Sequence, residues 1–389
     1  MKELVIVGSA SDNAFVEDIA YHLNQHEDYL DIISLKTFLN TEFCPRFIID
    51  EYREDNVGNK LAGRHVLIVS TSLPPYSRDE LAMRNYLIAR AAKDNGADRV
   101  CLLEPDLFYS AQDRGPRPEH GITDFKRDIE DYKKFDGQPF SARLYADLLK
   151  NSGVDEVVTV HNHSSSVEKI FMDRFSGNFH NMTPSDVYAS YLRESDIVHL
   201  EGSVICAPDK GAKDFAREVH RAIGIDTVDM LFLDKSRRGE RSVEMCYSAD
   251  SPISLRDIKG RDVVVIDDMV RTGTTIVECC KILKKFSPRR ILFFVTHFYS
   301  SREGRTNLNA PEIDEIVTTS SIPSILNRDV QGRLRHKMVV LRISRWISSY
   351  LRKLVDPDSE ELNPPLYKEE MSSKNPRWRG KMGPLFSNE

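Results

Sequence analysis

The sequence lacks the long apolar run that a membrane-spanning helix requires, since no stretch approaches about 18 consecutive apolar residues. Its first fifteen residues also lack the apolar core of a secretory signal. Neither sign of charge dominates: 54 Lys and Arg stand against 60 Asp and Glu, a formal net charge of −6. This balance argues against a protein whose main role is non-specific binding to nucleic acid or membranes, and we expect neither as a partner.

Cysteine is scarce and is not spaced for metal binding. The chain has six cysteines without a C-x-x-C pair, and several of them lie within apolar runs. This pattern argues against a disulfide framework or a zinc ribbon and indicates a reducing, cytoplasmic compartment. The chain also lacks G-x-x-x-x-G-K-[ST], so any ATP that it uses is not held by a Walker loop.

What is present, over 389 residues, is an alternation of short apolar runs with helix-period segments. The runs are rich in β-branched residues and do not alternate with polar residues, which is typical of strands buried on both faces. We therefore expect an α/β fold with parallel sheets in two successive units. Strands are expected at residues 4–7, 66–69, 100–103, 157–160, 204–207, 230–233, 263–266 and 291–295. Helices are expected at 15–23, capped by Ser11 or Asp12, and at 141–149, 212–223 and 276–286.

The composition also suggests where the units begin and end. We predict an N-terminal domain over 1–160, a C-terminal domain over 161–350, and a polar, disordered tail over 351–389. Residues 115–137 are polar, charged and poor in apolar side chains, and we expect them to form a long insertion in the first domain.

The strongest chemical signal lies where the 263–266 strand ends. Two carboxylates, Asp267 and Asp268, precede a loop of small residues that opens a helix. Ligands of open α/β sheets bind at the carboxyl ends of strands, and backbone N–H groups at a helix N-terminus bind anions. The loop therefore fits a phosphate monoester, and the two acids fit sugar hydroxyls or Mg²⁺. The loop residues are Thr272, Gly273, Thr274 and Thr275.

This segment resembles the phosphoribosyl-diphosphate loop of the type I phosphoribosyltransferase fold. Over roughly residues 1 to 345 the chain resembles the PRPP synthetases, the ribose-phosphate diphosphokinases of that fold. The resemblance implies two tandem phosphoribosyltransferase-like domains, each a mostly parallel sheet flanked by helices. It also implies a Mg²⁺-dependent transferase that moves the β,γ-diphosphate of ATP to the 1-hydroxyl of ribose 5-phosphate, giving PRPP and AMP.

Several segments of the second half carry this resemblance. Asp234-Lys-Ser-Arg-Arg238 matches the family's mobile catalytic loop, in which Lys235 and Arg237 correspond to cations that stabilise the transferred phosphoryl group. Ala207-Pro-Asp-Lys-Gly211 matches a family segment that places Asp209 on the ribose or metal side. In His161-Asn-His163, the last residue corresponds to the family histidine that meets Mg²⁺–ATP. The resemblance therefore implies a metal near His163 and Asp209.

Two segments of the first half correspond to the family's ATP site. Phe38-Leu-Asn-Thr-Glu42 matches a loop that grips adenine across a subunit boundary, and Tyr109-Ser-Ala-Gln-Asp-Arg114 matches a nucleotide-binding segment. Because this loop would contact the adenine bound to a neighbouring subunit, the resemblance implies a homo-oligomer, either a dimer or a hexamer. The ATP-binding residues that the match implies are Phe38, Asn40, Glu42, Gln112, Asp113 and Arg114.

The chain departs from the family pattern in ways that leave alternatives open. Arg271 adds a cation to the phosphate loop that could reach a second phosphate, so a larger acceptor such as ADP-ribose is one alternative. Four other departures, at positions 40, 41, 111 and 161, favour a non-catalytic, regulatory assembly protein related to the synthetases. A simple phosphoribosyltransferase is a third alternative, against which the cationic loop and the two-domain length argue. Asn40 and Thr41 replace Asp and Gly, Ala111 replaces Arg, and His161 replaces Asp.

Overall fold

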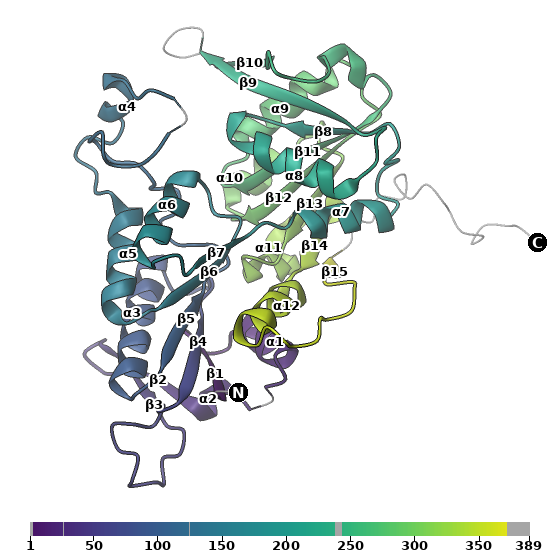
Figure 1. The fold of residues 1–389 in the computed structure, drawn as a ribbon. Helices are drawn as coiled ribbons and strands as arrows, with labels where there is room; N and C mark the ends of the chain where they lie inside the picture. The colour runs from purple at the N-terminus through teal and green to yellow at the C-terminus, as the bar shows by residue number, and fades with distance from the viewer. Residues whose placement is uncertain (1–2, 26, 124, 238–242, 372–389) are drawn as a thin grey trace, which may run out of the picture. The chain divides into compact units, whose positions relative to one another are not determined.

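The computed structural model describes residues 3–25, 27–123, 125–237 and 243–371. They form two units, each built on a largely parallel β-sheet with helices on both faces (Figure 1). The α/β class predicted from the sequence is therefore confirmed. Within these ranges, no helix combines the length and the apolar character that crossing a membrane would demand.

The two units do not divide the chain at a single point. The expected boundary at residue 160 falls between β6 (Glu156–Val160) and β7 (Phe179–Met182), which pair as neighbours in one sheet. The first unit therefore continues to Met182, and the chain returns to it near its C-terminal end. The first unit comprises Met1–Met182, Ser321–Ser324 and Ile343–Leu366, and the second comprises Thr183–Ser320, Ile325–Arg342 and Tyr367–Glu389.

The segment expected to be a disordered tail is regular in much of its described part. Helix α12 (Ser344–Val355) extends into it, because apolar side chains recur at helical spacing and are buried along one face. Strand β15 (Lys368–Met371) then pairs antiparallel with β14 (Met338–Arg342). Residues 372–389 of the predicted tail lie outside the described residues.

The sheet of the first unit is parallel throughout, in the order β1–β4–β5–β6–β7. Strands β1 (Glu3–Gly8), β4 (Arg64–Val69), β5 (Arg99–Leu103) and β6 confirm the predictions at 4–7, 66–69, 100–103 and 157–160. Their apolar runs do not alternate because helices cover both faces of the sheet. Val66, for example, is 1% exposed and its neighbour Leu67 is 2% exposed.

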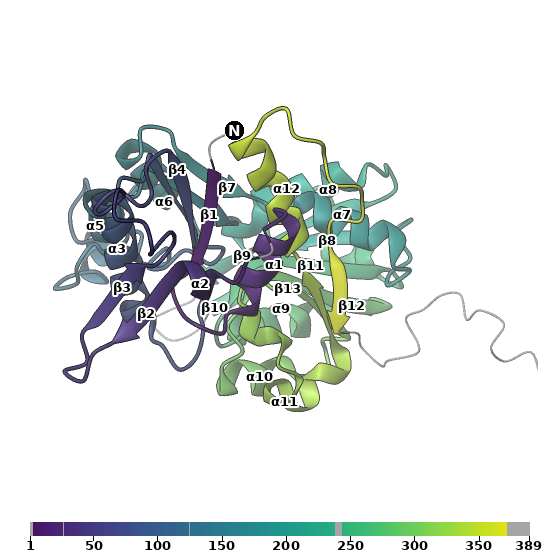
Figure 2. The same ribbon diagram turned by 90° about the horizontal axis from the view of Figure 1, so that it is seen from below.

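Helices cover this sheet in two groups. Helices α3 (Arg78–Asp94), α5 (Ser141–Ser152) and α6 (Ser165–Arg174) lie on one face, and α1 (Ala14–His22) lies beside α12 on the other (Figures 1 and 2). Helices α1 and α5 confirm the helices expected at 15–23 and 141–149.

The predicted cap of α1 is wrong, because the side chain of Asn13 accepts the Phe15 N–H at 3.1 Å in place of Ser11 or Asp12. The remaining elements of the unit are α2 (Tyr29–Ile32), β2 (Ile33–Thr37), β3 (Phe43–Phe47) and α4 (Ile129–Lys133).

The insertion expected at 115–137 is ordered around one buried arginine. The side chain of Arg127 is 4% exposed and donates hydrogen bonds to the backbone oxygens of Gly115, at 2.7 Å, and His120, at 2.9 Å. Its guanidinium also pairs with the carboxylate of Asp131 in α4, at 2.6 Å. The polar composition of the segment therefore reflects an internal hydrogen-bond network.

The sheet of the second unit has eight strands in the order β10–β9–β8–β11–β12–β13–β14–β15. All neighbours are parallel except the two edge pairs, β10–β9 and β14–β15. The strands predicted at 204–207, 230–233, 263–266 and 291–295 are confirmed. They are β8 (Val204–Ala207), β9 (Asp229–Arg237), β11 (Asp262–Val270) and β12 (Arg290–Phe298), and the sheet also contains β10 (Val243–Tyr247) and β13 (Glu315–Thr319).

Helices also cover both faces of the second sheet. Helices α7 (Ser185–Glu194) and α8 (Lys213–Ile223) pack together on one face, and α9 (Thr274–Lys284) and α10 (Arg302–Leu308) on the other (Figure 1). Helices α8 and α9 confirm the helices expected at 212–223 and 276–286. On α9 an apolar stripe at helical spacing, at most 2% exposed, faces the core and consists of Ile276, Cys279, Cys280 and Leu283. Shorter helices are α11 (Arg328–Gln331) and the 3-10 turns η1 (Lys210–Ala212), η2 (Leu255–Ile258), η3 (Pro323–Leu326) and η4 (Gly332–Lys337).

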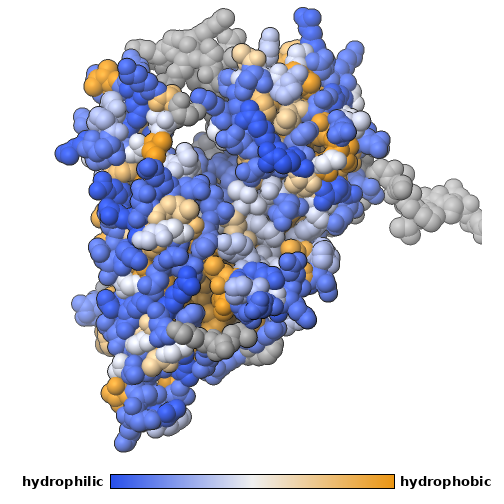
Figure 3. All heavy atoms as spheres, in the orientation of Figure 1, coloured by the Kyte–Doolittle hydropathy of each residue, from blue (hydrophilic) through white to orange (hydrophobic). Residues whose placement is uncertain are grey.

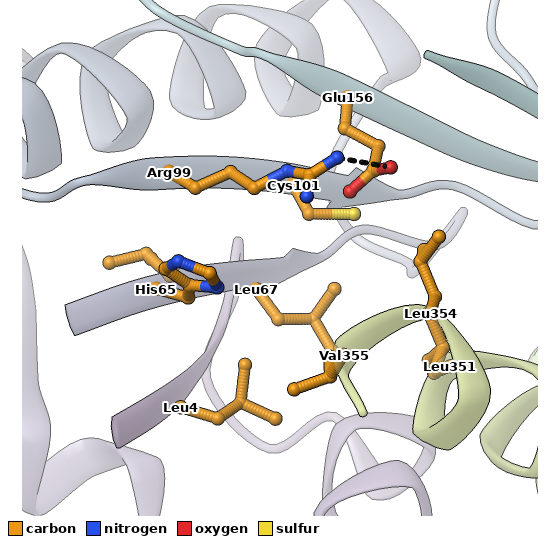
Figure 4. A pocket seen from close by; sticks show the side chains of 10 residues that line it. Leu4, His65, Leu67, Arg99, Cys101, Glu156, Leu351, Leu354 and Val355 are labelled. Carbon is orange, nitrogen blue, oxygen red and sulfur yellow. Dashed lines mark hydrogen bonds and ion pairs between the residues drawn. The ribbon is translucent and has the colours of Figure 1, made fainter. Parts of the chain in front are cut away.

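A small cavity of about 60 Å³ lies in the first unit between the strands and the end of α12 (Figure 4). The aliphatic side chains of Leu4, Leu67 and Leu351 line it, and apolar side chains gather in a hollow beside α12 in Figure 3. Its volume is far below the roughly 300–1,000 Å³ of ordinary ligand pockets. We therefore interpret it as a packing gap under α12.

A buried carboxylate beside this cavity anchors α12. Glu156 is 3% exposed, and its carboxylate pairs with Arg99 at 2.7 Å and with His180 at 2.8 Å (Figure 4). The other ring nitrogen of His180 is hydrogen-bonded to the Tyr350 hydroxyl of α12 at 2.7 Å. The helix is thereby tied to the sheet by a polar chain as well as by apolar packing.

The carboxyl edge of the first sheet is occupied by the protein's own polar groups. Glu104, directly after β5, is fully buried and accepts hydrogen bonds from Phe108 N–H at 2.8 Å and from the Tyr145 hydroxyl at 2.9 Å. Asn85 donates both to Glu104, at 3.1 Å, and to Ser70 at the end of β4, at 3.0 Å. Burial raises the pKa of Glu104 from 4.5 to about 8.

This burial predicts a specific pH dependence of stability. Between about pH 4.5 and pH 8 the unfolded chain releases a proton that folded Glu104 retains, so the free energy of unfolding should fall as the pH rises. Glu104→Gln removes the titration, so the stability of the variant relative to the wild type should increase from pH 5 to pH 8. Denaturant unfolding across this range measures the difference, with the exposed Glu54→Gln as control. A pH-independent difference would contradict the prediction.

Candidate functional site

The order of the strands reverses between β8 and β11 in the second sheet. From β8 the chain adds β9 on one side, and it then adds β11, β12, β13 and β14 successively on the other side. At such a reversal the connecting segments leave in opposite directions, which opens a crevice at the carboxyl ends of the two strands. Asp209 follows β8 there, and Asp267 and Asp268 lie near the end of β11.

The three acids form an electrostatically unfavourable cluster. Burial, together with the negative charges of Asp268 and Asp209, raises the pKa of Asp267 well above its usual range. Backbone amides stabilise the others: Asp268 accepts the Met269 N–H at 2.7 Å, and Asp209 accepts the Gly211 N–H at 3.1 Å. A ligand that brings hydroxyl donors or a cation to this edge would relieve the repulsion.

The phosphate loop lies between this cluster and α9. Gly273 adopts φ +75°, which glycine tolerates without strain, and it directly precedes the helix. No side chain in the described chain caps the first turn of α9, so its backbone N–H groups lack a side-chain acceptor. The hydroxyls of Thr272 and Thr274 lie 3.4 Å apart beside these amides. Amides and hydroxyls together make a site suited to a phosphate.

Residues of α10 and its cap brace this loop, and the sequence analysis missed them. Ser301 donates its hydroxyl to the Arg271 carbonyl at 2.8 Å, and Asn307 donates its amide to the Thr272 carbonyl at 2.8 Å. Leu308 packs so closely that a Cβ added to Gly273 would lie 2.8 Å from its Cγ. No local pattern marks these residues, because they lie some thirty positions further along the chain and only the fold brings them near.

The two predicted catalytic cations lie on β9. The backbone of Lys235 pairs with Met245 of β10, and that of Arg237 pairs with Val243. The side chains of both cations, and residue 238 of the predicted catalytic loop, lie outside the described part of the chain. Their catalytic role therefore stays a prediction.

The predicted adenine-binding loop forms the tip of the β2–β3 hairpin. Phe38 is 43% exposed there, and the Asn40 side-chain amide donates to the Glu42 carboxylate at 2.8 Å. Thr41 adopts φ +72°, a conformation that favours glycine, the residue found at this position in the family pattern. The hairpin therefore holds a β-branched residue in a backbone conformation that glycine adopts more easily.

The other predicted residues of the first unit make internal contacts. Asp113 is buried and accepts the Ser164 hydroxyl at 2.7 Å, while Arg114 pairs with Asp131 of the insertion at 3.3 Å. Gln112 is exposed. These contacts give Asp113 and Arg114 a structural role in addition to the predicted nucleotide role.

His163, the predicted metal-side histidine, is exposed just before α6. It belongs to the first unit, whereas Asp209 belongs to the second. The metal predicted near both residues stays a prediction.

Known proteins resemble the chain in both sequence and fold. Residues 188–325 match the family model described as the phosphoribosyl transferase domain. The ribose-phosphate pyrophosphokinase of Methanopyrus kandleri is 30% identical over 261 residues, which cover 67% of this chain and 77% of that protein. The chain belongs to the ribose-phosphate pyrophosphokinase family. The predicted resemblance is confirmed, and the chain is an enzyme of this transferase kind.

Further comparisons extend the match over most of the chain. The ribose-phosphate pyrophosphokinase of Methanobrevibacter smithii is 27% identical over 332 residues, covering 84% of this chain and 96% of that protein. The phosphoribosylpyrophosphate synthetase structure from Mycobacterium smegmatis superposes with a TM-score of 0.70 at 21% identity, covering 92% of this chain and 100% of that one. The fold is therefore shared along nearly the whole length of a pyrophosphokinase.

The packing of Leu308 on Gly273 predicts an unusually costly substitution. Gly273→Ala introduces both the unfavourable positive φ, about 1–2 kcal/mol, and a clash with Leu308, about 1–3 kcal/mol more. Gly202→Ala is the matched control, because Gly202 has φ +74° in the same unit and its added Cβ meets nothing within 4 Å. Denaturant unfolding should show a larger loss for Gly273→Ala, and equal losses would contradict the clash.

Proposed function

We propose that this enzyme transfers the β,γ-diphosphate of ATP to the 1-hydroxyl of ribose 5-phosphate, giving PRPP and AMP. The observation that carries the proposal is the junction at the strand reversal, where the three acids of β8 and β11 adjoin the uncapped N-terminus of α9. A sugar phosphate has the matching chemistry, since one end is a dianion and its ring hydroxyls are hydrogen-bond donors. The relatives are ribose-phosphate pyrophosphokinases, a name that agrees with this substrate class.

In this proposal the protein groups divide between the two ends of the sugar. The 5-phosphate accepts hydrogen bonds from the α9 amides and from Thr272, Thr274 and Thr275, and Asp267 and Asp268 accept from the 2- and 3-hydroxyls. The 1-hydroxyl oxygen attacks the β-phosphorus in line, the bond from that phosphorus to the bridging α,β-oxygen breaks, and AMP leaves. The hydroxyl proton passes to solvent. Catalysis consists of alignment and charge stabilisation.

The acidic edge also fits a magnesium ion that is shared with the substrates. Among the described residues, no group of three or more His, Cys, Asp or Glu side chains is arranged to hold a metal by itself. Mg²⁺ commonly binds through one or two carboxylates plus substrate phosphates, and the raised pKa of Asp267 is consistent with a site that favours an added cation. One or two of the carboxylates of Asp209, Asp267 and Asp268, together with the substrate phosphates, would hold it, and it would neutralise charge on the phosphates.

The ATP side of the proposal uses the first unit and a second copy of the chain. Phe38, Asn40 and Glu42 bind adenine from the hairpin of a neighbouring subunit, and Gln112, Asp113 and Arg114 meet the nucleotide. The exposure of Phe38 supports this, because a large, half-exposed aromatic ring at a hairpin tip can stack on a base, and the Lys36 ammonium 4.9 Å from its centre adds a positive charge beside it. The proposal therefore includes a homo-oligomer.

The deciding experiment follows AMP and the sugar product together. Protein, MgCl₂, ATP and ribose 5-phosphate should yield AMP and a product heavier by one diphosphate in equal amounts.

Lys235→Ala should lower turnover by about 10²–10³-fold with little change in ribose 5-phosphate binding, since the cation stabilises charge that develops during transfer. The exposed Lys259→Ala is the control. Base-dependent release of diphosphate from PRPP without ATP would instead identify a phosphoribosyltransferase, and absence of both reactions would favour an assembly protein.

Arg271 favours a second candidate acceptor. It is exposed on the phosphate loop, its carbonyl is fixed by Ser301, and its guanidinium lies 3.6 Å from the sulfur of Met269. A cation held there suits an acceptor with a second phosphate and a free anomeric hydroxyl, such as ADP-ribose.

The two acceptors can be distinguished with one variant. Arg271→Gln should reduce kcat/KM for ADP-ribose about tenfold or more beyond any loss for ribose 5-phosphate, because one charged hydrogen bond is removed only from the former. The exposed Arg256→Gln should affect neither. Equal losses for both acceptors, or no product from ADP-ribose with the wild type, would exclude the second candidate.

A further inference from the structure

The strand that carries Lys235 leaves the main sheet before it reaches that residue. Strand β9 pairs with β8 only as far as Phe232, and from Leu233 to Arg237 its partner within the described chain is β10 alone. The two strands thus extend beyond β8 as a ribbon (Figure 1). A two-stranded ribbon has little stability of its own, so contacts at its base determine how well its direction is fixed.

Lys213 makes these contacts at the base. It is the first residue of α8, and its side chain is only 9% exposed. Its ammonium lies 2.7 Å from the Ser248 hydroxyl, 2.8 Å from the Asp250 carboxylate and 3.3 Å from the Asp234 carboxylate. Asp234 lies on β9 and Ser248 directly follows β10. One buried cation therefore ties both strands of the ribbon to the helix.

The charges around Lys213 show why it cannot be replaced by an apolar side chain without effect. Ser248 accepts from Lys213 and lies within hydrogen-bonding distance of both carboxylates, although its single proton can be donated to only one of them. The hydrogen bond from Lys213 lowers the pKa of Asp250 to about 2. Without the ammonium, two carboxylates would compete for one hydroxyl at the base of the ribbon.

Arg217, one turn later on α8, provides a natural comparison. Its guanidinium lies 3.5 Å from the same Asp250 carboxylate and 4.8 Å from the ring of Phe232. Its side chain is 40% exposed, and exposed pairs of this kind contribute little. The buried ammonium and the exposed guanidinium therefore share a partner but differ in burial and in contact with Asp234.

We propose that Lys213 is a positioning residue, which holds the β9–β10 ribbon in the direction that brings Lys235 and Arg237 to the transferring diphosphate. The inference rests on the proposed function for its catalytic consequence. Lys213 is four residues from Asp209, but its contacts with Ser248, Asp250 and Asp234 involve no residue of the phosphate loop. Its loss should therefore impair transfer and leave binding of the sugar phosphate intact.

The first test compares Lys213→Met with Arg217→Met in steady-state kinetics. Misplacement of a catalytic group by about 1 Å costs on the order of 100-fold in rate, so we expect kcat of Lys213→Met to fall about 30- to 100-fold. Its KM for ribose 5-phosphate and the affinity for that sugar by calorimetry should stay within about twofold. Arg217→Met should stay within about twofold in all three. A kcat within twofold for Lys213→Met, or a parallel loss of sugar affinity, would overturn the proposal.

The second test asks whether the defect is caused by the carboxylates of Asp234 and Asp250, which lose their cation in Lys213→Met. Asp250→Asn added to Lys213→Met removes one of the two competing charges, and kcat should recover about fivefold or more relative to Lys213→Met. A general packing defect would not be corrected by this change. Absence of any recovery would therefore overturn the charge-based account of positioning.

The third test does not depend on activity. Hydrogen exchange of the backbone amides in β9 and β10 should accelerate about tenfold in Lys213→Met and remain unchanged in Arg217→Met, with β11 as an internal reference. Unchanged exchange in the ribbon would overturn the inference whatever the reaction is. A wild-type protein that forms no AMP would instead overturn the proposed function and the catalytic part of the inference, even if the exchange result stands.

Discussion

The reversal of strand order between β8 and β11 is the constraint on which the candidate site depends. The segments that follow β8 and β11 leave the sheet in opposite directions. Neither segment therefore crosses over the carboxyl ends of these two strands. Because Asp209 follows one strand and Asp267 and Asp268 lie near the end of the other, three acids meet at this edge although nearly sixty residues separate Asp209 from Asp267 in sequence. The phosphate loop lies beside this edge because β11 leads through Gly273 into α9.

The first unit shows what a similar sheet becomes without a reversal. Its strands follow one another in a single direction from β1 to β7. The carboxyl edge carries polar groups as well, but Ser9, Ser70 and Glu104 are buried and hydrogen-bond within the protein. Polar side chains at strand ends therefore have two outcomes in this chain: closure by internal hydrogen bonds in one sheet, and a cluster of mutually repelling acids in the other.

The features that could be predicted from the sequence are those encoded by neighbouring residues. Strands such as β8 and β11 are buried on both faces and therefore show unbroken β-branched runs, and the phosphate loop lies within one continuous segment. The apolar stripe of α9 was visible for the same reason. Strand β7 was not predicted, because its Phe-His-Asn-Met sequence has no such run and pairing with β6 alone makes it a strand.

What could not be predicted are interactions that tertiary structure creates. Asn307 reaches the phosphate loop from 35 residues away, and Lys213 meets Asp250 across 37 residues. Both are polar residues at ordinary helical positions, so nothing in their local sequence distinguishes them. The insertion is a similar case, since its charges suggested a solvated flap, whereas Arg127 and Asp131 satisfy one another in its interior.

The path of the chain through α12 has a consequence for biosynthesis. This helix belongs to the first unit, yet it is translated after almost all of the second. Until it emerges from the ribosome, the strand residues that line the cavity beneath it, among them Leu4 and Leu67, stay exposed. Domains that are contiguous in sequence can complete their folding in order of synthesis. Here the unit that is synthesised first cannot be completed in that order, because its helix α12 follows most of the second unit in the sequence.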